Sequence, residues 1–475
     1  MFDRLQSRPV KGGSVQLRLE TTPPRVSGGL PVLGHSLQFI RSPAELLLRA
    51  QREHGEVAVM EVFGRRMVGF FGPEAHAAIF RASDDELNAW DAYKIMTPVF
   101  GKDVAYDAEP TRMAEQLHML VPALKESRMA TYSEAVIQEA ELAIQDWGEE
   151  GEIDLADFAR SLTHFTSSRC LLGHEFREEM TDRFASAYRD LVAGVKPIAF
   201  LNSRLPLPSF IRRDRARAEM AKMIHEITEA RRRQPTASED FLQTLMDAHY
   251  SNGESLNEHE VTGVLLAAMF AGHHTSSAAT AWTVLDLLQN PGYLDRVRLE
   301  VDSIFNGGRV THQGIREMTV TGNAIKEALR LHPPIFLLFR VVRKTVFKYK
   351  SFSFDPGTWL LISPMVGHRL PEIFQDPDRF DPDRFAPPRV EDRHPYAFIP
   401  FGGGQHVCLG SAFAMLQIKT ILGLLFSRYE LGLAGNRIAP NYRGLVVGPM
   451  QPCRVRYRRR RPVAVRTRAE ARVRG

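Results

Sequence analysis

Hydrophobic and polar residues follow a helical period along most of the chain, and only short segments follow the period of a strand. The helical pattern predicts helices over residues 42–53, 129–147, 178–193, 215–233, 241–250, 257–289 and 411–426. Two apolar runs on either side of Gly64-Arg65-Arg66 predict a β-hairpin over residues 57–71. Short strands are expected again at residues 359–363 and 445–447. The pattern therefore predicts a mainly α fold with a small β part.

The longest predicted helix has clear signals at both ends. Ser255 with Glu258, or Asn257 with Glu260, would form a capping box at its start. Asn290, which precedes a proline, would end it. About 33 residues at a rise of 1.5 Å each would extend about 50 Å, enough to cross a large domain.

The middle of this helix, Ala271-Gly272-His273-His274-Thr275, is locally unfavourable for a helix. Gly272 costs about 1 kcal/mol relative to Ala in a helix interior. Thr275 can donate to the carbonyl four residues earlier and bend the helix. Taken alone, His273 and His274 would be polar residues on one helix face. A costly segment inside a good helix nevertheless indicates a functional role.

A glycine-rich segment, Phe401–Gly410, contains Cys408 and directly precedes a predicted helix. Glycines let the backbone turn sharply and pass close to a flat ligand. The dipole and free N–H groups of a helix N-terminus favour a thiolate. These are the properties that an axial cysteine ligand of haem iron requires. The alternative is a buried structural cysteine after a glycine-rich loop.

The chain of 475 residues has an ordinary soluble composition, with 44% apolar and 25% charged residues. Its three cysteines, Cys170, Cys408 and Cys453, exclude a disulfide framework and a four-cysteine iron–sulfur cluster. Residues 454–475 carry ten arginines and one glutamate. That segment contributes +9 to a total net charge of +5, so the remainder is −4. The body of the chain therefore shows no basic face for nucleic acid.

No long apolar stretch occurs near the N-terminus, because charged residues interrupt residues 1–22 throughout. We expect a soluble, cytoplasmic protein without a secretory signal or a transmembrane anchor. We also expect a flexible extension over residues 1–23, one large folded domain over 24–456 and a disordered arginine-rich tail over 457–475.

Several motifs together resemble those of the cytochrome P-450 superfamily. The spacing Phe-x-x-Gly-x-His-x-Cys-x-Gly in residues 401–410 is similar to its haem loop, and Ala271–Thr275 is similar to its oxygen-binding groove. Glu327-Ala-Leu-Arg330 and Pro382-Asp-Arg-Phe385 resemble two further superfamily motifs. Tyr93–Asp107 looks like the substrate-recognition signature of one member family, the sterol 14α-demethylases.

The resemblance implies a role for each matching residue. Cys408 would ligate the iron of haem b, and Gly272, His274 and Thr275 would form the catalytic groove. The residues that would contact haem or bond its propionates are Tyr93, Arg340, Phe401, Gly402 and His406. The residues that would line the substrate pocket are Ile95, Met96, Phe100, Phe270, Ala271, Leu337 and Leu445. Glu327, Arg330 and Arg384 would form a buried ion network that braces the haem loop.

The chain departs from the family pattern at several of these positions. His406 stands where Arg is usual, and His274 stands where most superfamily members have an acid. Ile95 occupies a position that is often Phe or Leu and that is associated with preference at the sterol C4 methyls. Val192 stands where the family has an acid that pairs with the groove histidine, although Asp190 lies nearby in sequence.

The resemblance implies a monooxygenase that removes the 14α-methyl of a sterol precursor in three oxygenations and expels it as formate. It would use O2 and take electrons from a separate ferredoxin or flavodoxin-type donor, because no flavin or ferredoxin module is visible in the sequence. Two alternatives remain. One is a monooxygenase of the same fold that acts on another terpenoid or lipid. The other is a non-catalytic haem-binding sensor, against which the oxygen-activating groove argues.

Overall fold

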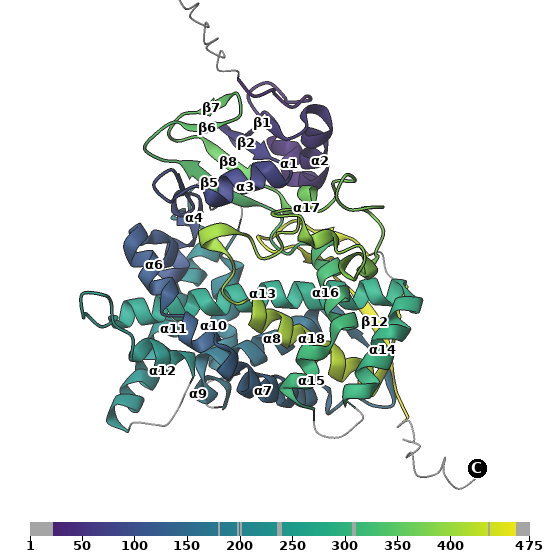
Figure 1. Cartoon of the computed structure of the whole chain (residues 1–475). Helices are drawn as coiled ribbons and strands as arrows, with labels where there is room; N and C mark the ends of the chain where they lie inside the picture. Colours follow the sequence, from purple (N-terminus) through teal and green to yellow (C-terminus); the bar gives the residue numbers. More distant parts are fainter. Residues whose placement is uncertain are drawn as a thin grey trace, which may run out of the picture.

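The computed structural model describes residues 22–178, 181–196, 199, 202–234, 240–305, 310–435 and 438–461. Most of residues 1–23 and of the predicted tail, namely 1–21 and 462–475, lie outside the described residues. Figure 1 shows a broad helical part that carries a smaller part rich in strands at one end. The prediction of a mainly α fold with a small β part is confirmed.

The helical part contains the longest elements of the chain. The helices are α1 (Ser36–Arg41), α2 (Pro43–His54), α3 (Pro73–Arg81), α4 (Trp90–Tyr93), α5 (Thr97–Phe100), α6 (Pro110–His118), α7 (Glu126–Ile144), α8 (Leu155–Ser167), α9 (His174–Glu178), α10 (Thr181–Ala193), α11 (Pro208–Arg233), α12 (Phe241–Met246), α13 (Glu258–Gln289), α14 (Pro291–Phe305), α15 (His312–Glu317), α16 (Thr319–Leu331), α17 (Pro364–Gly367) and α18 (Ser411–Arg428). A π-helical turn, Ser168–Leu172, continues α8.

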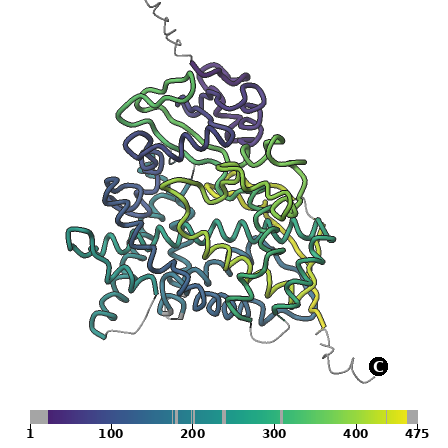
Figure 2. The backbone as a smooth tube through the Cα atoms, in the orientation of Figure 1, coloured from purple at the N-terminus to yellow at the C-terminus, as the bar shows by residue number. Residues whose placement is uncertain are grey.

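The strands form one larger sheet and three small ones. They are β1 (Val57–Val62), β2 (Arg65–Phe70), β3 (Leu87–Asn88), β4 (Glu150–Asp154), β5 (Leu338–Val342), β6 (Phe347–Tyr349), β7 (Phe352–Phe354), β8 (Trp359–Ile362), β9 (Tyr429–Leu433), β10 (Pro440–Asn441), β11 (Gly448–Pro449) and β12 (Arg454–Arg459). The five-stranded sheet has the order β1-β2-β8-β5-β3, so strands far apart in sequence lie side by side. Figure 2 shows this interleaving of the purple N-terminal segment with green residues near 350.

Helix α13 crosses the middle of the helical part (Figure 1). The Asn257 side chain accepts from the backbone N–H of Glu260, and the Glu260 side chain accepts from that of Asn257. This is the second of the two predicted capping boxes. The helix ends at Gln289, where the backbone N–H of Asn290 bonds to the Leu287 carbonyl. Most of its side chains are buried against α8, α16 and α18, so its position is determined from several sides.

The C-terminal segment corrects two predictions. Residues 445–447 form no strand; the strand there is β11, which begins at Gly448. The predicted tail from 457 is wrong at its start, because β12 continues to Arg459 and pairs with both β4 and β9. Tyr457 stacks on Trp147, with ring centroids 4.4 Å apart. Arg460, which directly follows β12, donates to both carboxylate oxygens of Asp302 at 2.7 and 2.8 Å.

The exposed arginines of β12 are paired with acids on neighbouring strands. Arg454 donates to Glu152 at 3.1 Å, and Arg458 donates to Glu430 at 2.5 Å. These pairs explain why a run of like charges can form an ordered strand. Among the helices that the structure describes, none combines the length and apolar character needed to cross a membrane.

Candidate active site

The glycine-rich loop holds Cys408 just before α18. The backbone N–H of Cys408 donates to the Phe401 carbonyl at 2.8 Å and closes the loop. Gly404 has φ +64°, and a Cβ at this position would lie 1.9 Å from the carbonyl oxygen of Phe80. Only glycine permits this close approach. Because α18 begins at Ser411, Cys408 lies three residues before a helix N-terminus, as predicted from the sequence.

The Cys408 side chain is exposed, although protein surrounds it closely enough for burial to raise the pKa of its thiol. A backbone hydrogen bond from Gly410 acts in the opposite direction and lowers this pKa. The other two cysteines, Cys170 and Cys453, are buried. Burial raises the pKa of Cys453 to about 11, and it also raises that of Cys170. Among the three cysteines, Cys408 alone is exposed, so it is the one whose sulfur can reach a bound group.

The surroundings of Cys408 fit a group that carries carboxylates. Arg340, in β5, is only 6% exposed, and its guanidinium donates to the neighbouring Phe339 carbonyl at 2.8 Å. Among the described residues, no carboxylate lies within ion-pair distance of Arg340, and a buried cation without a counterion is costly. A haem propionate would supply that counterion through a charge-assisted hydrogen bond.

Two tyrosines connect Arg340 with Cys408. The rings of Tyr93 and Tyr106 lie 5.0 Å apart, and both side chains are half-buried. Burial raises the pKa of Tyr106 to about 12; Tyr93 and Cys408 also raise it, whereas Arg340 lowers it. Tyr106 therefore lies within electrostatic range of the other three residues. The structure brings Cys408, Arg340 and Tyr93 together as predicted, and it adds Tyr106.

His406 has a partner that the sequence did not indicate. Its Nε2 lies 2.6 Å from a carboxylate oxygen of Asp84, which precedes β3. The His406 side chain is directed at an acid rather than left free for a propionate. The predicted propionate contact of His406 would therefore have to form in competition with Asp84.

The locally unfavourable segment of the sequence lies in the middle of α13. Ala271 is exposed in the middle of a helix whose neighbouring residues are largely buried. The Thr275 hydroxyl donates to the Ala271 carbonyl at 2.6 Å. A Cβ at Gly272 would lie 3.6 Å from Leu171 and 3.9 Å from the Ser167 hydroxyl, so that position faces α8. The predicted groove therefore consists of Ala271 and Thr275, with Gly272 directed toward the neighbouring helix.

The two groove histidines differ in their partners. His273 is buried, and its Nε2 lies 2.9 Å from the Arg160 carbonyl, so this nitrogen carries the proton. Its Nδ1 lies 3.4 Å from the hydroxyl oxygen of Tyr188, and that hydroxyl donates to the Met269 carbonyl at 3.4 Å. His274 stacks on Tyr188, but its Nε2 is buried and has no hydrogen-bond partner in the described part of the chain. Burial, with Arg160 and His164 nearby, lowers the pKa of His274 to about 4.

Helix α10 supplies Tyr188 to this histidine cluster instead of an acid. Val192 is half-buried and packs against the main hydrophobic core. Asp190 is half-exposed and lies 4.0 Å from Arg212 of α11. In the structure it therefore takes no part in the cluster around His274. With a pKa near 4 and no acidic partner, His274 is neutral at physiological pH.

The predicted pocket residues are distributed over two apolar clusters. Met96, Phe100, Phe270 and Leu445 belong to or pack against the main core, which also contacts Ile95. The rings of Phe100 and Phe270 meet edge to face, with centroids 6.1 Å apart. Phe270 also contacts His274 in a T-shaped arrangement at 5.1 Å. The substrate signature and the groove are therefore in direct contact.

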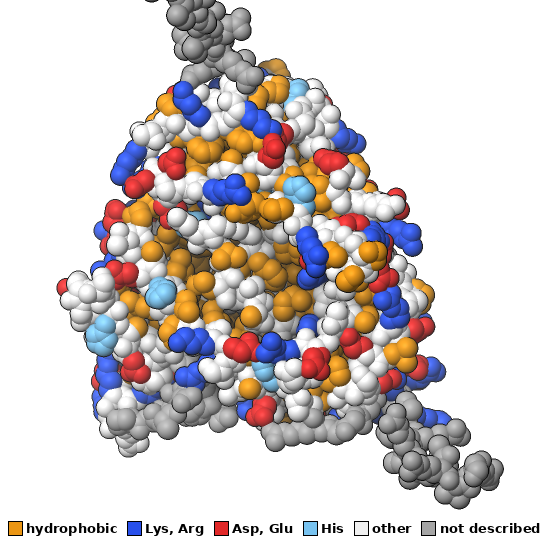
Figure 3. Space-filling model, in the orientation of Figure 1, with side chains coloured by type: hydrophobic (Ala, Val, Ile, Leu, Met, Phe, Trp, Pro, Cys, Tyr) orange, Lys and Arg blue, Asp and Glu red, His pale blue; other side chains and the backbone are white. Residues whose placement is uncertain are grey.

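Two other predicted pocket residues lie toward the strand-rich part. Leu337 is buried in a second cluster, against which Tyr93 packs. Ile95 also lines a surface recess of about 280 Å³ together with Arg65, Trp359 and Asn202. Figure 3 shows hydrophobic side chains gathered across the middle of this face, between the strand-rich part and the lower helices.

The predicted ion network has the expected geometry. Glu327, Arg330 and Arg384 have side chains that are 0% exposed. Arg330 donates to the two oxygens of Glu327 at 2.7 and 2.9 Å, and the Arg384 Nε donates to them at 3.0 and 3.1 Å. Glu391 accepts from Arg384 at 2.6 Å. The two guanidinium groups and two carboxylates balance in charge.

A chain of contacts joins this network to the haem loop. Arg330 donates to the carbonyl oxygen of His368 at 2.8 Å. The His368 Nε2 accepts from the backbone N–H of Ile399 at 2.9 Å. The Ile399 carbonyl accepts from the Gly402 N–H at 3.1 Å, at the start of the glycine-rich segment. The contacts are those expected of a brace for the Cys408 loop.

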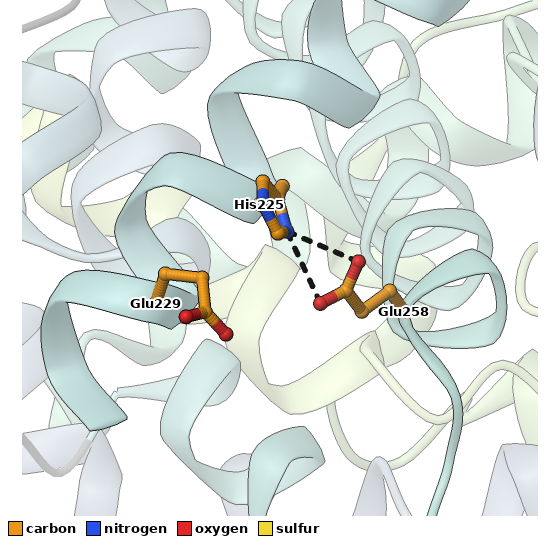
Figure 4. A group of neighbouring side chains, drawn as sticks. All are labelled: His225, Glu229 and Glu258. Carbon is orange, nitrogen blue, oxygen red and sulfur yellow. Dashed lines mark hydrogen bonds and ion pairs between the residues drawn. The ribbon is translucent and has the colours of Figure 1, made fainter. Parts of the chain in front are cut away.

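A group outside this site also has metal-ligating side chains. His225 and Glu229 on α11 face Glu258 at the start of α13, with ligand atoms within 4.8 Å of one another (Figure 4). Arg232 already binds both carboxylates, at 2.7 and 3.2 Å. His225 and Glu258 are exposed and Glu229 is half-buried, and the group is explained as an ion-pair junction between two helices.

Sequence reasoning gave no role to Tyr106 or to Asp84. Tyr106 lies within the signature segment Tyr93–Asp107. Nothing in the neighbouring sequence, however, indicated that its ring would lie beside Tyr93 and near Cys408. Asp84 lies 322 residues from its partner His406, and no sequence pattern connects them.

We compared the chain with known protein families and with curated proteins. The family model described as Cytochrome P450 matches residues 23–454. A sterol 14alpha-demethylase of Mycolicibacterium vanbaalenii is 38% identical over 445 residues, which cover 92% of this chain and 98% of that protein. An obtusifoliol 14-alpha demethylase of Triticum aestivum is 36% identical over 447 residues, covering 92% of this chain and 99% of the relative.

Solved structures show the same fold. The retinoic acid bound cyanobacterial CYP120A1 superimposes with a TM-score of 0.82 at 24% identity, over 92% of this chain and 99% of that one. At this identity the likeness extends to the fold alone.

Proposed function

The chain belongs to the cytochrome P450 family, and from that premise we propose that it removes the 14α-methyl group of a sterol precursor. It is a monooxygenase with haem b as its cofactor. The observation that carries the proposal is the contact between the signature segment and the groove, where Phe100 packs against Phe270. The similarity to sterol and obtusifoliol demethylases over nearly the whole chain supports the same substrate class.

The chemistry that haem b would supply when bound is dioxygen activation and insertion of one oxygen atom into a C–H bond of the substrate. In our proposal, Cys408 would supply a thiolate ligand to the iron, and the closed loop of Phe401 and Gly402 would hold its sulfur in place. Arg340 and Tyr93 orient the group through its propionates, because Arg340 is a buried cation in need of a counterion. His406 would be shared between a propionate and Asp84, or it would stay with Asp84 and leave the propionate to Arg340.

The apolar residues bind and orient the substrate. A rigid tetracyclic sterol has few polar groups, and Met96, Phe100, Phe270 and Leu445 offer an apolar surface with few polar atoms. Ala271 leaves room beside α13 at the reacting position. In the three successive oxygenations, the methyl group becomes an alcohol and an aldehyde and then leaves as formate.

The Thr275 hydroxyl is placed to hold and move a proton. The hydroxyl donates to the Ala271 carbonyl, and this hydrogen bond fixes its orientation. His274 is neutral, because burial lowers its pKa to about 4, and within the described ranges no acid pairs with it. We therefore assign proton delivery chiefly to Thr275 and water rather than to a charged histidine.

The electrons come from a separate protein. P450 enzymes work with redox partners, and this chain matches the P450 family model across residues 23–454. We propose a ferredoxin or flavodoxin-type donor.

Optical titration tests the substrate class. Lanosterol, obtusifoliol and a non-sterol terpenoid are added to the haem-loaded protein, and the shift of the Soret band is measured. We expect saturable shifts with at least one sterol and none with the terpenoid. A shift with the terpenoid alone would assign the enzyme to another lipid substrate.

A further inference from the structure

The backbone at the end of α5 is enclosed between two long helices. The Phe100 carbonyl lies so close to α13 that a Cβ at Gly263 would be 2.2 Å from its oxygen. The next residue, Gly101, has φ +115°, and a Cβ there would be 2.6 Å from both Arg217 and His259. The segment that carries Phe100 therefore fits into its position only with glycine at both contacts.

Arg217 of α11 reaches this segment from one side. Its Nη2 donates to the Phe100 carbonyl at 3.0 Å. The Nε of Arg217 is buried without a hydrogen-bond partner, and in the described part of the chain no carboxylate lies within ion-pair distance of its guanidinium. Burial lowers the pKa of this side chain. Arg217 is thus a partly buried cation whose principal partner is one backbone carbonyl.

His259 reaches the same segment from the first turn of α13. Its Nε2 donates to the Lys102 carbonyl at 3.0 Å. With the proton on Nε2, its Nδ1 is free to accept from Arg217 Nη2 at 3.4 Å. One histidine tautomer therefore satisfies both contacts, and Arg217 and His259 together hold residues 100–102.

Helix α11 is itself fastened to the start of α13 beside these contacts. The Nδ1 of His225 lies 3.1 Å from each carboxylate oxygen of Glu258. Dashed lines in Figure 4 mark these two contacts. Arg232 lies 3.2 Å from the same carboxylate. These pairs hold α11 and the first turn of α13 together, so Arg217 and His259 approach Phe100 from a common frame.

We infer that Arg217 is a positioning residue for the substrate pocket, acting through the Phe100 backbone to place the Phe100 ring against Phe270. The inference rests on the proposed assignment of Phe100 to the pocket. It links the position of α11, at the outside of the molecule, to the apolar surface that a substrate contacts.

A purely structural role for Arg217 is disfavoured because the same loop has other anchors. Thr97 donates to Asp107 at 2.7 Å, and the Ala105 N–H donates to Gln116 at 2.8 Å. Gln116 in turn donates to the Tyr250 hydroxyl at 3.0 Å. The loop therefore keeps its fold without Arg217, and only the end of α5 is freed.

Two imidazoles test the inference on the haem-loaded protein. Imidazole binds iron and is too small to fill an apolar pocket, whereas 1-dodecylimidazole carries a long apolar chain into it. Their dissociation constants are measured from the Soret shift for wild type, Arg217→Met and Arg217→Lys. Arg215→Met is the matched control, because Arg215 is exposed on the same helix.

For Arg217→Met we expect binding of 1-dodecylimidazole to weaken about tenfold, the effect of losing one charged hydrogen bond. Imidazole binding should change less than about twofold, since it needs iron access alone. Arg217→Lys should recover part of the loss, and Arg215→Met should behave as wild type. In a Phe100→Leu background, Arg217→Met should have little further effect, because the positioned ring is already gone.

Equal weakening of both imidazoles, or loss of haem in Arg217→Met, would show that Arg217 is structural and overturn the inference. Unchanged binding of both probes would also overturn it. Neither probe is a sterol, so failure of the proposed substrate class would leave this test intact and would appear only in the sterol titration.

Discussion

The two sides of the haem site are built on different principles. The loop that holds Cys408 is braced by fully buried charges that are paired with each other: Glu327 accepts from both Arg330 and Arg384. The groove side, centred on Thr275, is built around neutral groups. Its His274 has a buried Nε2 that finds no hydrogen-bond partner among the described residues.

The difference suggests that one side of the site fixes the Cys408 loop in place and that the other side takes part in the reaction. A balanced set of buried charges has one good geometry, and removal of any member leaves a charge uncompensated, so the loop is fixed firmly. The groove keeps polar atoms without full hydrogen bonding, which costs stability but leaves them available to substrate, oxygen and water. Mutations in the ion network should therefore lower the stability of the protein. Mutations in the groove should instead lower the rate or the coupling of the reaction.

The largest effect is expected from Glu327→Ala. Two buried guanidinium groups would lose their shared carboxylate, at a cost of about 3–5 kcal/mol. We expect little haem-loaded protein, measured as haem per chain, and a much lower midpoint of urea unfolding for whatever folds.

The matched control is Glu152→Ala, which removes an acid that also faces two arginines, Arg454 and Arg456, but at the surface. Exposed pairs contribute under about 1 kcal/mol, so this variant should load haem normally. If the two variants were equally stable, the buried network would not be the brace that its contacts indicate.

Acid should weaken the groove side through its buried histidines. Burial lowers the pKa of His164 to about 4, with Arg177 and Arg189 adding to the effect. Because the unfolded value is higher, the unfolded state binds the proton first, and stability falls as pH falls from about 6.5 to about 4. At pH 5 a single such histidine costs about 2 kcal/mol relative to pH 8.

His164→Phe should therefore lose less stability than wild type between pH 8 and pH 5, as urea unfolding at both pH values would measure. His394→Phe, at an exposed position, serves as the control and should leave the pH dependence unchanged. An identical acid sensitivity in wild type and His164→Phe would contradict the neutral buried state of this ring.

A smaller effect, confined to chemistry, is expected for Thr275→Ala. Substrate binding depends on the apolar pocket and should persist, whereas product formed per NADPH should fall about tenfold. This is below the usual contribution of a positioned proton donor, because water can partly replace the hydroxyl. Hydrogen peroxide would account for the missing electrons, and Thr275→Ser should restore much of the coupling.

His274→Ala refines this prediction. Since His274 is neutral and unpartnered, we expect its loss to change coupling by less than about threefold. An effect equal to that of Thr275→Ala would mean that the histidine delivers protons despite its low pKa. Unchanged coupling in both variants would show that the groove assignment is wrong.

Local signals in the sequence predicted much of the scaffold correctly. The capping pair Asn257 and Glu260, and Asn290 with the following proline, placed α13 within a residue at each end. The hairpin around Gly64 and the helix after Cys408 also followed from local pattern. These features depend on neighbouring residues, so one stretch of sequence contains the necessary information.

What the sequence did not reveal depends on residues far apart in the chain. The end of β12, from residue 457, was taken for a tail because arginines dominate the local composition, while the acids that pair with them lie in β4 and β9. Arg217 and Phe100 are 117 residues apart, and nothing near either residue indicates the contact. Gly272 was expected in the catalytic groove because a motif gives only the spacing of residues along the chain. The side of α13 on which Gly272 lies depends on how α13 packs on α8, and Gly272 faces α8.

The fate of the 14α-methyl carbon tests the account most directly. Lanosterol or obtusifoliol labelled at that carbon would be incubated with the haem-loaded enzyme, a ferredoxin, its reductase and NADPH. The account predicts one labelled formate for each Δ14 sterol formed, with no label left in that product. Turnover that leaves the label in a hydroxylated sterol, or turnover of a non-sterol terpenoid alone, would contradict it.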